Sequence, residues 1–138
     1  MGHPLSAAQL AYLAGEYTQL GTTLEHYQED HSGDPDFDQA AAQQFISDIG
    51  DVADGLANQG IATEFNDTAA AYASLTKVTE GANETAASLA QEAGKFSRIA
   101  KIATAILGLA ASLGSGNPAS VFQSIAACTQ AIGGGNSA

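Results

Sequence analysis

Residues 95–132 read KFSRIAKIATAILGLAASLGSGNPASVFQSIAACTQAI, and this stretch decides the fold of the chain. The whole chain carries a formal net charge of −11, but three of its four Lys and Arg residues stand at the start of this stretch. The rest of the stretch consists mostly of small and apolar residues with helical spacing. It therefore forms either the packed core of a helical domain or a surface for a membrane or a partner.

The composition of the remaining chain also favours helix. Alanine accounts for 29 of the 138 residues, and alanine is the best helix former because it loses no side-chain entropy in a helix. A hydrophobic content of 45% is typical of a globular domain. We expect a single helical domain over residues 1–132 and a flexible Gly-rich tail over residues 133–138.

Two helices are predicted in the first 60 residues. In the first, apolar residues alternate spacings of three and four behind a cap at Ser6. The second opens at DPDFD, where Asp34 is the expected N-cap and Pro35 fits the first turn, and it ends at Gly60, a left-handed cap. The loop around HSG is short, which predicts an antiparallel hairpin. The apolar positions of the first helix are Leu10, Leu13, Tyr17, Leu20, Leu24 and Tyr27.

From Ile61 one apolar register continues without a slip to Ala110. Read literally, it predicts one very long helix over residues 61–113. The alternative is a break at EGANET, where Gly81 interrupts the helix and Asn83 caps a new one. We favour the break, because it gives helices of similar length. With a last helix that Asn117 caps, the sequence predicts an all-α, alanine-rich, antiparallel bundle of four to five helices.

Several kinds of chemistry are excluded or weakly supported. Fifteen acidic against four basic residues argue against nucleic-acid binding, which needs clustered cations. No nucleotide-binding or hydrolase motif occurs, so we expect neither an enzyme nor a cofactor. His26, Asp30 and His31 are the weak candidates for a metal site, although exposed residues at a helix end explain them more simply. Cys128 lies in an apolar run and is expected to be a buried, inert thiol.

The stretch 95–132 presents two faces. Large aliphatic residues form one stripe, and beside it small residues recur every four positions, which is the spacing that lets a second helix approach closely. We expect these faces, together with part of the last helix, to make the contacts of this protein. The candidate interaction residues are Ile99, Ala100, Ile102, Thr104, Ile106, Gly108, Leu109, Ser112, Leu113, Val121, Phe122 and Ile125.

Three environments can cover these faces: the first helices of the same chain, another protein molecule, or a lipid bilayer. The chain start has no signal-peptide pattern, and each arm of the stretch has only 12 to 15 suitable residues, too short for a single transmembrane span. We therefore expect a non-catalytic interaction or assembly protein that binds itself or another protein and forms a homo-oligomer. The alternatives are a membrane-active, pore-forming type of protein that uses the hydrophobic hairpin 99–132, and a metal-binding helical bundle.

Overall fold

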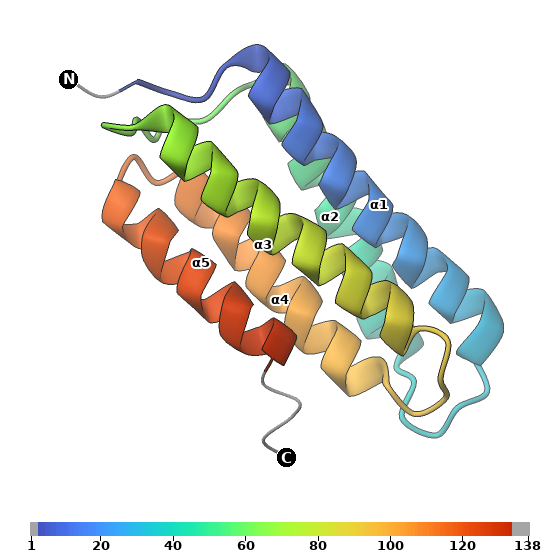
Figure 1. Ribbon diagram of the computed structural model, residues 1–138. Helices are drawn as coiled ribbons and strands as arrows, with labels where there is room; N and C mark the ends of the chain where they lie inside the picture. The colour runs from blue at the N-terminus through green and yellow to red at the C-terminus, as the bar shows by residue number, and fades with distance from the viewer. Residues whose placement is uncertain (1–2, 134–138) are drawn as a thin grey trace.

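The computed structural model describes residues 3–133, which form five helices. The helices lie side by side, and each runs opposite to the one before it (Figure 1). No strand occurs among residues 3–133, where His3 and Phe65 form an isolated bridge. The all-α prediction is therefore confirmed. The predicted tail lies outside the described residues except for Gly133, which closes the last helix. The helices are α1 (Ala7–His31), α2 (Gln39–Asn58), α3 (Thr68–Leu89), α4 (Phe96–Leu113) and α5 (Pro118–Gly133).

Side-chain caps fix where the first three helices begin. The Ser6 hydroxyl accepts a hydrogen bond from the backbone N–H of Gln9, whose side chain returns the bond, so the predicted cap of α1 is confirmed. Asp38 and Asp67 cap α2 and α3, each accepting the backbone N–H of the residue three positions on, Ala41 and Ala70. The prediction that Asp34 caps the second helix is wrong, because a turn follows Asp34 and α2 starts only at residue 39.

The long helix over residues 61–113 and the break at Gly81 are both wrong. Helix α3 continues through Gly81, where an added Cβ would lie 3.6 Å from Ile132 Cδ1, so this glycine packs closely against α5. Asn83 is not a cap but a buried residue of α3, and its amide donates to the Glu16 carbonyl of α1. The chain breaks instead over residues 90–95, where Gly94 has a φ of +75°, a value that glycine adopts without strain.

The apolar stripes of the helices meet in one continuous core. All six predicted apolar positions of α1 are buried, and Tyr17 donates a hydrogen bond from its hydroxyl to the Ile106 carbonyl of α4 at 2.6 Å. Helix α5 lies along α3 and α4 (Figure 1) and buries only Val121 and Cys128. The large aliphatic stripe of α4 is therefore covered by its own chain. Its buried residues are Ile99, Ile102, Ile106, Leu109 and Leu113.

Candidate interaction surface

All charged residues of this chain lie in its first 101 residues. Residues 102–138 contain no Asp, Glu, Lys, Arg or His, so α5 and the last twelve residues of α4 contribute no charge to the surface. This signal was present in the sequence, but a composition taken over the whole chain conceals it. We call the exposed part of this region the charge-free surface. Its residues are Thr104, Gly108 and Ala111 of α4 and Pro118, Ala119, Phe122, Gln123, Ala126, Ala127, Thr129, Gln130 and Gly133 of α5.

Phe122 is the most prominent residue of the charge-free surface. Its side chain is 50% exposed, and only Tyr12, at 45%, is a comparably exposed large hydrophobic among the described residues. The Phe122 and Phe65 rings pack in a T-shaped contact with 6.2 Å between the ring centroids. The predicted interaction residue Phe122 is thus left half open, whereas Val121 is fully buried and Ile125 partly buried.

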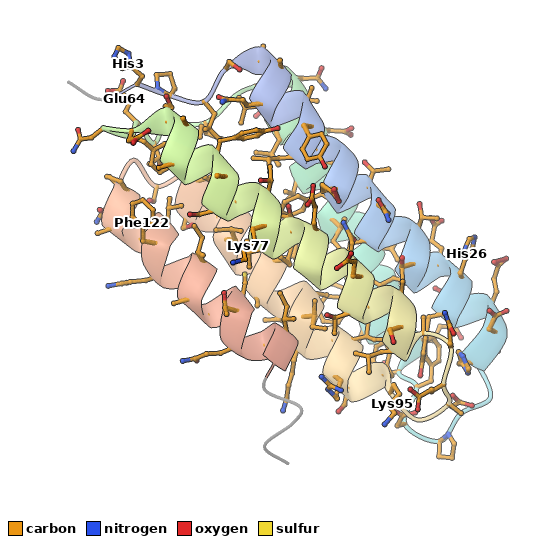
Figure 2. The ribbon with its side chains drawn as sticks, viewed as in Figure 1. His3, His26, Glu64, Lys77, Lys95 and Phe122 are labelled. Atoms are coloured by element: carbon orange, nitrogen blue, oxygen red, sulfur yellow. The ribbon has the colours of Figure 1, made fainter. Side chains whose placement is uncertain are left out.

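A groove of about 390 Å³ runs between α3 and α5 beside the charge-free surface. Figure 2 shows Lys77 reaching from α3 toward α5 at this groove. No carboxylate lies within ion-pair distance of the Lys77 ammonium among residues 3–133. We call this feature the α3–α5 groove. It is lined by Ser74, Lys77, Val78, Gly81, Ile125, Thr129 and Ile132.

The small-residue ladder of α4 is only partly covered by the rest of the chain. Thr104 and Gly108 are exposed, and a Cβ at Gly108 would meet no atom within 4 Å. Ala100 is half-buried, and Ser112 is buried with its hydroxyl bonded to the Leu109 carbonyl. Helix α5 does approach α4 closely, but it does so beside the ladder, where Cys128 contacts the Ala105 carbonyl. Part of the ladder belongs to the charge-free surface instead.

The weak metal candidates do not come together. His31 directs Nδ1 at an Asp34 carboxylate oxygen 3.1 Å away and Nε2 at the Ala90 carbonyl 2.9 Å away, so both nitrogens are engaged. His26 and Asp30 are exposed, and Figure 2 shows His26 on the outer side of α1. Among residues 3–133 no group of three His, Cys, Asp or Glu side chains is arranged to hold a metal ion.

The loop between α1 and α2 supplies the side-chain acceptors at the start of α4, a contact that the sequence did not predict. The carboxylate of Asp36 accepts the backbone N–H of Phe96 at 3.0 Å, and that of Asp34 accepts the N–H of Gly94 at 3.2 Å. Lys95, the residue before α4, makes no side-chain cap of its own. Carboxylates placed at this end also complement the positive end of the helix dipole. Asp36 therefore supplies the side-chain acceptor that the N-cap residue Lys95 lacks, although 60 residues separate it from Phe96.

Cys128 has the environment of an inert thiol, as predicted. Its side chain is 1% exposed, and its sulfur donates to the Ala105 carbonyl at 3.1 Å. Burial raises the pKa of the thiol to about 11. Because the thiolate is the reactive form of cysteine, the folded protein holds this group in its unreactive state at neutral pH.

By length and composition, α4 is the one helix among residues 3–133 that meets the requirements for crossing a membrane, with a mean hydropathy of 1.4 over its 18 residues. Buried core helices of water-soluble proteins meet the same requirements, and eight residues of α4 are buried against the rest of this chain.

No family model, curated protein or solved structure matches the chain.

Proposed function

We propose that this chain is a non-catalytic assembly protein: an alanine-rich, antiparallel helical bundle that binds a second copy of itself through the charge-free surface. The observation that carries the proposal is a surface without charges, bearing a half-exposed phenylalanine, on a chain of net charge −11. The large aliphatic stripe of α4 is already buried in the core of its own chain. The outer side of α5 is what remains for a partner.

The composition of this surface suits a protein interface. The centres of protein interfaces are depleted in charged residues and enriched in aromatic ones, since burying an unpaired charge is costly. Phe122 supplies the aromatic group, and the Ala residues and two Gln residues around it carry no charge. A partner that covers this surface therefore buries no charged side chain of α5.

Electrostatics indicate which surface two copies would use. Two copies that approach through any strongly acidic face meet like charges, which repel. Contact through the charge-free surfaces keeps the acidic faces turned away from each other. A homodimer built on this surface is the arrangement with the least repulsion between two chains of charge −11.

Sedimentation velocity from micromolar to millimolar protein tests the proposal. We expect a concentration-dependent dimer, and Gln123→Glu on the charge-free surface should raise its dissociation constant at least about tenfold, which corresponds to roughly 1.4 kcal/mol. The matched control is Gln19→Glu, which adds the same charge on the exposed side of α1 and should leave the dissociation constant close to that of the wild type. A monomer at every concentration would refute the proposal.

One observation supports a second candidate, a membrane-active protein that inserts the hairpin 99–132. We expected this arm to be too short for a span, but α4 has the length and hydropathy of one when its first turn is counted, and its neighbour α5 carries no charge. Insertion requires α4 to leave the core. We therefore expect the protein to release dye from liposomes only under conditions that also expose Tyr17 to solvent. Gly108→Glu, at an open position, should abolish release without unfolding the protein in water. Absence of leakage at every lipid composition and pH would eliminate this candidate.

A further inference from the structure

We propose that two copies meet about a two-fold axis through antiparallel α5 helices, with Phe122 of each copy seated in the α3–α5 groove of the other. This inference rests on the proposed self-association and adds the contact that carries it. A two-fold interface requires a surface that is complementary to itself. Here an exposed aromatic ring and an apolar groove occur on the same side of one helix.

The positions of the ring and the groove on α5 follow from the helix period. Phe122, Ile125, Thr129 and Ile132 are separated by three, four and three residues, so they form one stripe along the helix. The last three of them line the groove. Figure 2 shows Phe122 near the start of α5, on the side of the molecule where Lys77 lies between α3 and α5.

The spacing along α5 fits an antiparallel pair. The groove residues of α5 are centred near Thr129, about seven residues or roughly 10 Å beyond Phe122, at 1.5 Å per residue. A two-fold axis that passes α5 close to Ile125 and Ala126 places Phe122 of one copy opposite Thr129 of the other. The same axis creates the second, identical contact, so that each copy gives one ring and receives one.

The lining of the groove suits a phenyl ring. Its volume of about 390 Å³ exceeds the roughly 150 Å³ of an apolar cavity that holds benzene. Ser74 on the α3 side is small and leaves room, while Val78 and Ile125 supply apolar contacts. Gly81 lets Ile132 of α5 approach closely and so closes one end of the groove. The Lys77 ammonium, without an acidic partner among residues 3–133, lies at the rim, where it can interact with the face of an incoming ring.

The charge of the groove is compatible with a second copy, because its one charged residue, Lys77, is opposite in sign to the net charge of −11 that a second copy carries. A cationic partner would be attracted to the acidic faces rather than to a groove whose one charged residue is Lys77. The ring that this groove fits is displayed by the chain itself, on a surface that adds no like charge. A lipid chain or a different protein remains an outcome that the following experiment distinguishes.

The test combines two variants that remove different halves of the contact. Phe122→Ala removes the ring and leaves the groove, whereas Ser74→Leu fills the groove and leaves the ring. Each variant alone should raise the dissociation constant of the homodimer about 100-fold, because both symmetric contacts are lost. An equimolar mixture retains one intact contact per heterodimer and should associate about tenfold more tightly than either variant alone. Tyr12→Ala removes the other exposed aromatic ring and is the control.

The outcomes separate this inference from the proposed function. If wild type dimerises and Phe122→Ala dimerises equally well, the contact is wrong and self-association stands. If wild type stays monomeric at millimolar concentration, self-association itself is wrong. A photoreactive phenylalanine analogue at position 122, in a mixture of isotopically light and heavy protein, should crosslink to residues 74–81 of the other copy. Crosslinks to added lipid, or only within one chain, would overturn the proposal. Circular dichroism checks that every variant is folded.

Discussion

Removal of the Asp36 carboxylate tests the capping of α4 from a distance. In Asp36→Ala the backbone N–H of Phe96 loses its acceptor, and Lys95 offers no side-chain replacement. Asp36→Asn keeps an oxygen that can accept the hydrogen bond but removes the charge beside the helix dipole. The two variants therefore separate the hydrogen bond from the electrostatic contribution.

The size of the effect follows from known helix caps. Loss of an N-cap costs roughly 0.5–2 kcal/mol, and a carboxylate near a helix N-terminus contributes about 0.3–1 kcal/mol. Because Asp36 itself is exposed, we expect about 1.5 kcal/mol for Asp36→Ala and about half of that for Asp36→Asn. Unfolding entropies of roughly 2.1 cal/mol/K per residue give about 0.3 kcal/mol/K for this chain. The alanine variant should thus melt about 5 °C below wild type.

Thermal and urea unfolding, followed by circular dichroism, measure this difference. Asp51→Asn is the matched control for Asp36→Asn, since Asp51 is exposed in α2 and its substitution removes the same charge without touching a helix end. The reasoning is refuted if Asp36→Ala melts within one degree of wild type, or if Asp51→Asn destabilises the protein as much as Asp36→Asn does.

Three further results are expected. Tyr17→Phe removes the buried hydrogen bond to the Ile106 carbonyl and should cost about 1 kcal/mol, which chemical denaturation will show as a lower midpoint with an unchanged slope. Burial raises the pKa of Cys128 from 9.0 to about 11, so the thiol of the unfolded chain loses its proton at lower pH than that of the folded chain. The free energy of unfolding should therefore fall as the pH rises from 9 to 11. Cys128→Ala should reduce this fall in melting temperatures measured against pH, and an unchanged pH dependence would contradict the prediction. Higher salt should strengthen dimerisation, because screening weakens the repulsion between two acidic chains and the charge-free surface has no ion pairs that salt could weaken. Sedimentation at low and high sodium chloride measures this effect. Weaker association at high salt would indicate a charged interface.

The parts of the fold that the sequence predicted depend on neighbours along the chain. The Ser6 cap and the apolar face of α1 involve residues within one or two helical turns of each other, and both are confirmed. The end of α3 was missed because the apolar register continues through the connection, so periodicity shows no interruption there. That connection depends on the backbone of Gly94 and on carboxylates from a loop 60 residues away, which no local pattern contains.

The candidate surface was predicted in part for a similar reason. Helical spacing separates a large face of α4 from a small one, but it does not tell which of them the rest of the chain covers. The structure assigns the large face to the core and leaves Gly108 open. Phe122 was identified as an interaction residue, yet its exposure depends on how α5 lies against Phe65, a contact between distant segments.

The capping of α4 by the first loop also bears on the order in which the helices assemble. Helices α1 and α2 are joined by a short loop and pack mainly on each other, so their hairpin is the part with the most local contacts, and local contacts form fastest. The first turn of α4 gains its acceptor only after that hairpin is in place. A late contact of this kind is absent from the folding transition state, so Asp36→Ala should accelerate unfolding and leave the refolding rate unchanged. The loop between α1 and α2 then serves as the docking point that completes the second half of the molecule.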